Sequence, residues 1–253
     1  MSLLRRFIES QQRLSSAFDR LLPADYSIDG NTDFLKSFAP QYLCIGQFAI
    51  DVGSGKHPYL RPAQKRDLKI HVTGLDISQD ELDSAPPGTY DQSICADITK
   101  YVGNNDVDLV ICQALLEHVP DVRAAFQSMA SMLKPGGKAV LFVPSRNAVF
   151  ARLNLILPEE VKRKILFAIF PAARQGQGFK SYYNRCTPDD FRQITGDVGL
   201  QVIAFRAYYV SSYFSFFFPL YFAWRIWVIL FRWLLGDQAA ETFCIALEKP
   251  TGC

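Results

Sequence analysis

The sequence lacks the cysteine and histidine patterns that would indicate a disulfide framework or a metal centre. Its 253 residues include six cysteines and three histidines, but no C-x-x-C pair and no cysteine–histidine spacing typical of a metal site. The cysteines are scattered, and several lie in apolar, strand-like runs. This pattern predicts reduced thiols, as in a cytoplasmic protein, and no bound metal.

The chain also lacks a strong overall charge, an internal repeat and a secretory signal. Its net charge of +2 provides no overall field for a polyanion, so we expect no nucleic-acid partner. Residues 1–6 are not followed by the apolar core of a signal peptide. The length allows one large domain, or one domain with an appendage, and a sizeable core.

What the chain does contain is a succession of short apolar runs that end in polar residues or glycine. Such runs are typical of buried parallel strands. Helical or loop segments separate them, and this alternation predicts a parallel, doubly wound sheet. We expect strands at residues 48–52, 71–77, 92–96, 107–112 and 138–143.

Two helices are marked by their patterns. Apolar residues at near-helical spacing in residues 2–22 predict an amphipathic helix. We expect it to pack on the domain, and a membrane-touching arm is the alternative. Asp121 is suited to cap a second helix that runs to about Leu133 and stops at residues 134–137.

A glycine turn and acidic residues follow the first strands. Gly53 and Gly55, just after Asp51, allow a tight turn with exposed backbone N–H groups at the edge where open α/β sheets bind ligands. Asp76 ends the second strand and Asp97 follows the third. Carboxylates at this edge suit ribose hydroxyls, an adenine amine and a cationic sulfonium better than a pyrophosphate.

Six motifs occur in a fixed order across about residues 45–145. They are Asp51-Val52-Gly53-Ser54-Gly55, Gly74-Leu75-Asp76-Ile77-Ser78, Ala96-Asp97-Ile98-Thr99, Val107-Asp108-Leu109-Val110, Leu116-Glu117-His118-Val119 and Leu133-Lys134-Pro135-Gly136-Gly137. In order and spacing this stretch resembles the class I S-adenosylmethionine-dependent methyltransferases. The resemblance implies S-adenosylmethionine as the cofactor.

The resemblance also assigns parts of the cofactor to successive strand ends. It implies that Gly53 and Gly55 flank the amino-acid part and that Asp76 holds the ribose. Asp97 with Ile98 would hold the adenine. The full set of cofactor-binding residues that the resemblance implies is Asp51, Gly53, Ser54, Gly55, Asp76, Ile77, Asp97, Ile98 and Gln113, the last near the methionyl group.

The family pattern further predicts how the chain ends. A helix at residues 187–194 should precede a sixth strand at 201–207, and an antiparallel last strand at 242–249 should lie between strands five and six. The expected fold is therefore α/β, with a doubly wound, Rossmann-like, mostly parallel seven-stranded sheet, an antiparallel last strand and helical insertions. We divide the chain into an N-terminal helical extension, 1–44, and a methyltransferase domain, 45–253.

Two insertions depart from a minimal family member, at residues 144–186 and 207–236. The first holds eight basic and two acidic residues, a net charge of +6. A helix should start at Pro158 because acidic residues fill its first turn, with Val161, Ile165, Leu166 and Ile169 on an apolar face.

The second insertion is long and apolar enough for a membrane span, but its two flanks should pair in one sheet, so a single crossing is excluded. We expect Pro219 to break it and a helix to lie in the membrane interface. Its aromatic residues would then face the lipid, and Arg225 and Arg232 the headgroups. A buried lid helix or a dimer interface is the alternative.

The reaction needs a nucleophile and, for a hydroxyl acceptor, a base. His118 is the candidate base because it follows the fourth strand at the ligand edge, although a structural role as a turn residue that bonds the backbone is the favoured interpretation. Tyr182, Tyr183 and Arg185 are candidate substrate contacts, since Arg185 could meet a phosphate or carboxylate.

These observations favour a methyltransferase that O-methylates a small amphipathic or lipid-linked acceptor, peripherally attached to the cytoplasmic, inner face of the membrane. A non-catalytic membrane module of the same fold and C-methylation of a quinone-like acceptor stay open. A nicotinamide dehydrogenase is disfavoured, because the third glycine of G-x-G-x-x-G would fall at Pro58. The sequence makes no prediction of oligomeric state.

Overall fold

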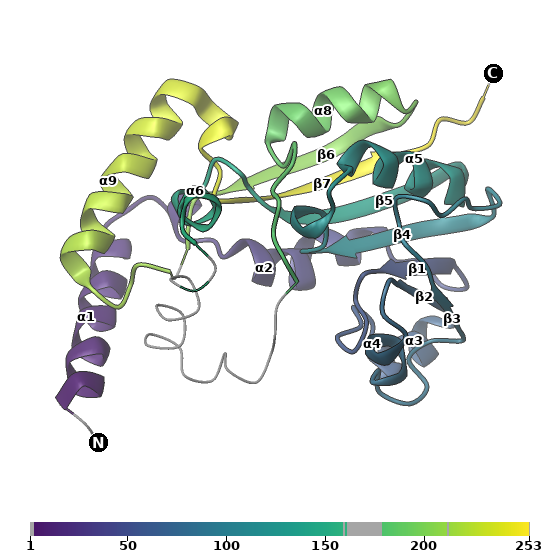
Figure 1. The fold of residues 1–253 in the computed structure, drawn as a ribbon, viewed down its shortest axis with the longest axis horizontal. Helices are drawn as coiled ribbons and strands as arrows, with labels where there is room; N and C mark the ends of the chain where they lie inside the picture. Colours follow the sequence, from purple (N-terminus) through teal and green to yellow (C-terminus); the bar gives the residue numbers. More distant parts are fainter. Residues whose placement is uncertain (1–2, 159, 161–178, 212, 253) are drawn as a thin grey trace.

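A seven-stranded sheet forms the centre of the molecule in a computed structural model, which describes residues 3–158, 160, 179–211 and 213–252 (Figure 1). The strand order is β3-β2-β1-β4-β5-β7-β6, and β7 is antiparallel to both of its neighbours. The predicted fold class is therefore confirmed. The strands are β1 (Phe48–Val52), β2 (His71–Asp76), β3 (Gln92–Cys95), β4 (Val107–Gln113), β5 (Leu133–Pro144), β6 (Gln201–Tyr208) and β7 (Thr242–Glu248).

The described part of the chain contains eight α-helices. They are α1 (Leu3–Asp19), α2 (Gly30–Asp33), α3 (Pro62–Leu68), α4 (Gln79–Asp83), α5 (Val122–Met132), α6 (Val149–Ile156), α8 (Pro188–Asp197) and α9 (Phe218–Leu235). Asp121 caps α5 as predicted, because its side chain accepts a hydrogen bond from the Ala124 N–H at 3.0 Å. The helix expected from Pro158, with Val161 to Ile169 on its apolar face, lies outside the described residues.

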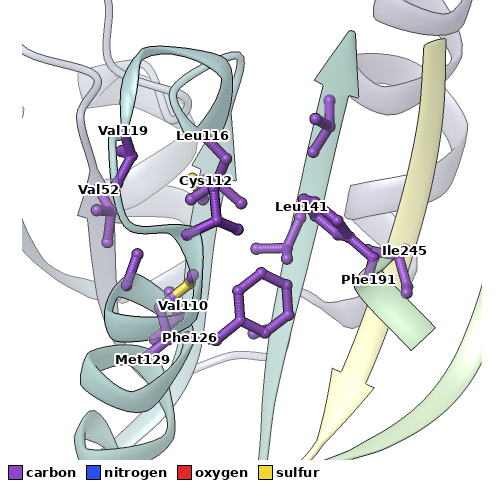
Figure 2. Packing of buried hydrophobic residues seen from close by; sticks show 14 of the residues in the cluster. Val52, Val110, Cys112, Leu116, Val119, Phe126, Met129, Leu141, Phe191 and Ile245 are labelled. Atoms are coloured by element: carbon purple, nitrogen blue, oxygen red, sulfur yellow. The ribbon is translucent and has the colours of Figure 1, made fainter. Parts of the chain in front are cut away.

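Alternating strand residues supply two hydrophobic cores, one on each face of the sheet. On one face, Val110 and Leu141 pack against Phe126 of α5 and Phe191 of α8 (Figure 2). On the other face, Ile111 belongs to a second cluster that includes Phe34, Phe38 and Leu60. This period of two is what buries both faces of a doubly wound sheet.

The start of β5 differs from the prediction. Residues 134–137 were expected as the turn that ends α5, but β5 begins at Leu133, directly after that helix. Backbone pairing on both sides extends the strand to Leu133, which lies opposite Val107 of β4. On the other side, the Gly136 N–H donates to the Lys249 carbonyl at 2.7 Å, and the Lys249 N–H donates to the Gly137 carbonyl at 2.9 Å.

The N-terminal 44 residues contribute to the domain core. Phe34 and Phe38 are buried beneath the sheet, and the Asp33 carboxylate accepts a hydrogen bond from the Tyr208 hydroxyl at 2.6 Å. Helix α1 lies beside α9 at the far end of the molecule (Figure 1). The sequence boundary at residue 45 therefore does not coincide with an edge of the hydrophobic core.

The second insertion folds differently from the expectation. Pro219 lies in the first turn of α9, where its missing N–H costs nothing, so it starts the helix and does not break it. Arg225 is fully buried: it donates to the Tyr209 and Tyr26 carbonyls at 2.6 and 2.5 Å and pairs with Asp19 at 2.9 Å. The expected headgroup orientation of Arg225 is therefore wrong.

Candidate active site

The glycine turn after β1 has a backbone shape that only glycine adopts readily. Gly53 and Gly55 have φ values of +71° and +44°. A Cβ on Gly53 would lie 2.5 Å from Leu115, and a Cβ on Gly55 would lie 2.8 Å from the Cβ of Glu81. The loop thus packs closely against Leu115 and Glu81 at the carboxyl edge of the sheet, in a conformation that requires glycine.

Asp51 holds this loop in place. Its carboxylate accepts hydrogen bonds from the Ser54 hydroxyl and from the Tyr59 N–H, the latter at 2.8 Å. Burial raises the pKa of Asp51 to about 6, and the nearby charge of Asp76 adds to the effect. Asp51 and Ser54 are therefore placed to shape the cofactor loop through contacts within the loop itself.

Asp76 and Ile77 form a polar and an apolar surface side by side at the end of β2. Asp76 is buried and accepts from the Ser78 N–H at 2.9 Å; burial, with a contribution from Glu81, raises its pKa. Ile77 is 62% exposed. A carboxylate beside an exposed apolar side chain fits a ribose with its attached base, so this edge suits S-adenosylmethionine.

Asp97 lies at the same edge, in a turn of its own. Hydrogen bonds from the backbone and hydroxyl of Thr99, at 2.9 and 2.8 Å, lower its pKa, and Lys100 lies 3.4 Å away. Ile98 is buried in the core. The carboxylate therefore stays ionised and can accept a further hydrogen bond from an adenine amine.

Gln113 ends β4 and reaches across the sheet edge. Its side-chain amide donates to the Asn31 Oδ1 at 2.7 Å, which ties α2 to the strand. Asn31 also lines a cavity of about 370 Å³ that opens beyond this point. Gln113 is thus placed between the expected cofactor site and that cavity.

The cavity combines aromatic and polar side chains from several distant parts of the chain. Its aromatic lining comes from Phe142, Phe150, Tyr183 and Tyr213, and Phe150 stacks on Tyr213 with ring centroids 4.5 Å apart. The polar lining comprises Asp29, Asn31, Glu117, His118, Asn154, Ser181, Ser211 and Thr242. A cavity of this kind suits a ring that carries hydroxyl groups.

Glu117 is a cavity residue that the sequence reasoning missed. It is 4% exposed, and burial raises its pKa to about 8. Its Oε1 lies 3.8 Å from the His118 Nε2, while Oε2 has no hydrogen-bond partner among the described residues. The one available signal was its place beside His118 in Leu116-Glu117-His118-Val119, which does not reveal burial.

The candidate catalytic and substrate residues separate into two groups. His118 and Tyr183 line the cavity, and the His118 Nδ1 lies 3.1 Å from the Lys180 carbonyl. Tyr182 and Arg185 do not belong to the lining: Tyr182 lies under Lys180, and Arg185 binds Asp190 and Gln193 at 3.3 and 2.8 Å. A substrate role for these two residues stays a prediction.

Comparisons with known proteins agree with this architecture. Residues 50–141 match the family model described as a methyltransferase domain. A ubiquinone biosynthesis O-methyltransferase of Coxiella burnetii (strain Dugway 5J108-111) is 33% identical over 175 residues, which cover 67% of this chain and 70% of the relative.

Two solved structures share the fold. The S-adenosylmethionine-dependent methyltransferase of Mesorhizobium loti has a TM-score of 0.55 at 14% identity, over 88% of this chain and 99% of that one. The geranyl diphosphate C-methyltransferase of Streptomyces coelicolor A3(2), crystallised with S-adenosyl-L-homocysteine, has a TM-score of 0.53 at 15% identity, over 84% and 74%. The chain belongs to the class I S-adenosylmethionine-dependent methyltransferases, and S-adenosylmethionine is its cofactor.

Proposed function

We propose that this enzyme methylates a hydroxyl group of a small amphipathic or lipid-linked acceptor at the surface of a membrane. The relatives' name, ubiquinone biosynthesis O-methyltransferase, supports oxygen as the methylated atom. The aromatic and polar cavity beside the cofactor edge supports a ring-bearing acceptor. The observation that carries the membrane part is the exposed face of α9.

The exposed face of α9 is apolar along its whole length and carries no charge. Both arginines of the helix face the protein, since Arg225 is buried and Arg232 packs on Tyr26 and Tyr209. An uncharged apolar surface of this extent marks a membrane or protein interface. The face consists of Phe217, Leu220, Phe222, Ile226, Trp227, Leu230, Trp233, Leu234 and Leu235.

Helix α9 is better suited to lie on a membrane than to cross it. Residues Phe218–Ala239 are long and apolar enough for a span, with a mean hydropathy of 1.3. However, Tyr208 and Thr242, which flank the insertion, are register partners in the sheet. One face of α9 also packs on the domain through Tyr221, Trp224 and Val228. The helix therefore fits the interface plane, with its outer face in the lipid.

Basic residues and the cavity lie toward the same end of the molecule. Helix α1, which lies beside α9, carries exposed arginines that include Arg6 and Arg13, and attraction to anionic headgroups favours the cytoplasmic, inner face of the membrane (Figure 1). Phe150 and Asn154 of α6, and Tyr213 just before α9, line the cavity. A lipid-linked acceptor could thus reach the cavity from the bilayer beside α9.

The protein's own contribution to the reaction is to position groups. S-adenosylmethionine supplies an electrophilic methyl group when bound. Gly53, Gly55 and Asp76 would hold the cofactor at the sheet edge, and the cavity lining would orient the acceptor hydroxyl toward it. Proximity of this kind accounts for a large part of the rate of a transfer reaction.

Label transfer tests the proposal. The protein is incubated with methyl-labelled S-adenosylmethionine and a total lipid extract, and a parallel reaction receives the aqueous extract of the same cells. We expect base-stable label in the organic phase, on an ether oxygen. Label found only in aqueous products, or on carbon, would contradict the proposed acceptor or the proposed atom. No transfer from either extract, despite cofactor binding, would indicate a non-catalytic module.

A further inference from the structure

We propose that Glu117 is the catalytic residue that accepts the proton of the acceptor hydroxyl, and that His118 is the residue that positions it. The inference rests on the proposed O-methylation and assigns its base. Glu117 lies in the short 3-10 turn Leu116–His118, directly after β4, and lines the cavity beside the cofactor edge.

The described surroundings of Glu117 leave one buried carboxylate oxygen without a hydrogen-bond donor. Within the described part of the chain, Oε2 has no hydrogen-bond partner, although the side chain is almost fully buried. Burying a carboxylate oxygen without a donor costs stability unless a ligand satisfies it. An acceptor hydroxyl in the cavity would supply that donor.

The geometry of His118 suits a supporting role. Its Nδ1 lies 3.1 Å from the Lys180 carbonyl, and because a carbonyl only accepts, this contact places the ring proton on Nδ1. Nε2 then lies 3.8 Å from the Glu117 Oε1, too far for a hydrogen bond. The imidazole is thereby held beside the carboxyl group and restricts its orientation by packing.

The two tyrosines of the cavity are poor bases. Burial, followed by the nearby charge of Glu117, raises the pKa of both Tyr183 and Tyr213. Their phenols therefore stay protonated at neutral pH and cannot remove the proton of the acceptor hydroxyl. Burial also raises the pKa of Glu117, but only to about 8, which is close to the pH at which a base works best.

The assigned step balances. The hydroxyl proton passes to Glu117, the acceptor oxygen forms a bond to the methyl carbon, and the C–S bond breaks with its electron pair on sulfur. The sulfonium becomes a neutral thioether and the acceptor an ether. Glu117 then loses its proton to water, which resets the site.

Kinetics of Glu117→Gln test the assignment. We expect kcat to fall about 10²–10⁴-fold, the usual contribution of a positioned base, with the cofactor Kd unchanged in calorimetry. In the wild type, kcat/KM should rise with pH to a plateau above about 8, as the carboxyl ionises, and Glu117→Gln should lose this step. His118→Gln should shift the step while keeping it. Glu248→Gln, on the surface of β7, is the matched control.

A titration that needs no turnover completes the test. In protein labelled with glutamate ¹³C at the carboxyl carbon, one resonance should titrate near pH 8 and be missing in Glu117→Gln. The inference is overturned if Glu117 titrates at an ordinary glutamate pKa, or if Glu117→Gln keeps kcat within about tenfold of the wild type. If Glu117→Gln does not fold, Glu117→Asp assigns the resonance in the titration, because aspartate is not labelled. Absence of methyl transfer in the wild type would instead defeat the proposed function.

Discussion

At the scale of single residues, three buried carboxyl groups have different roles in the site. Asp51 shapes the glycine loop, Asp76 faces the cofactor edge, and Glu117 lines the acceptor cavity. In all three, burial is the main cause of a raised pKa. Their different hydrogen-bond partners, and not their residue type, set their different roles.

The role proposed for Asp76 can be measured by binding. Asp76→Ala should weaken S-adenosylmethionine binding, because a carboxylate acceptor is lost and each hydrogen bond to a charged group contributes about 1.5–3 kcal/mol. Calorimetry gives the Kd, and Asp67→Ala, exposed on α3, is the control. Unchanged affinity in Asp76→Ala, or tight binding of NAD by the wild type, would contradict the assignment.

Arg225 is the residue on which the position of α9 depends. Arg225→Ala should reduce the free energy of unfolding by about 3–5 kcal/mol, since it leaves the partly buried Asp19 charge and two carbonyls without their donor. Urea denaturation measures the change. Arg232→Ala, whose partner Asp25 is largely exposed, should cost about 1 kcal/mol or less. Equal losses in the two variants would show that burial of Arg225 is not what matters.

Part of the site was predictable because its residues directly follow strands that the sequence reveals. Gly53, Gly55 and Asp76 each lie within a few residues of a strand end, so chain order alone placed them at one edge. Glu117 was not predictable, because its burial depends on contacts with residues far away in the sequence: its own carbonyl accepts hydrogen bonds from the Tyr182 and Tyr183 N–H groups.

At the scale of elements, the strands followed their apolar pattern closely, whereas α9 did not reveal which side it buries. Apart from Arg225 and Arg232, its sequence is apolar all round, so periodicity could not distinguish the two faces. The arginines were expected to mark the outer face. The structure buries Arg225, because Asp19 and the Tyr26 and Tyr209 carbonyls supply acceptors there. Arg232 packs on the Tyr26 and Tyr209 rings.

The outer face of α9 gives a prediction of its own. Replacing Trp227, Leu230 and Trp233 by serine should release the protein from anionic vesicles in flotation, with little change in melting temperature, because these side chains are exposed. Ile45→Ser with Val102→Ser, exposed elsewhere, is the matched control.

Salt distinguishes the electrostatic contribution to vesicle binding from the apolar contribution. Each basic residue near the surface contributes about 1 kcal/mol, so salt should weaken the binding of the wild type without abolishing it. If the wild type does not float with vesicles at any salt concentration, or forms a stable dimer that buries α9, then α9 is a lid or a dimer interface and not a membrane-binding surface.

The whole molecule should lose stability as pH rises. Asp51, Glu241 and Glu117 have pKa values raised by burial to about 6, 7 and 8. The folded state therefore binds more protons than the unfolded state between about pH 4 and 8, and the free energy of unfolding should fall across that interval. Urea denaturation at a series of pH values measures this. Glu117→Gln should flatten the decline at its upper end, and a wild-type stability that rises toward pH 8 would contradict the account.

The fold of the whole molecule was predictable because its topology follows the order of its motifs, including the insertion of β7 between β5 and β6. The role of the first 44 residues was not. Phe34 and Phe38 complete a core with strand residues distant in sequence, and no local pattern reports that packing.

Surface dilution tests the central claim most directly, that the acceptor is methylated at the membrane surface. A fixed amount of total lipid extract is mixed into vesicles with increasing amounts of anionic phosphatidylglycerol, so that the bulk acceptor concentration stays constant while its surface density falls. Initial rates of methyl transfer from labelled S-adenosylmethionine are then compared. The account predicts rates that fall in proportion to surface density. Rates that stay constant, and so follow the bulk concentration alone, would contradict it.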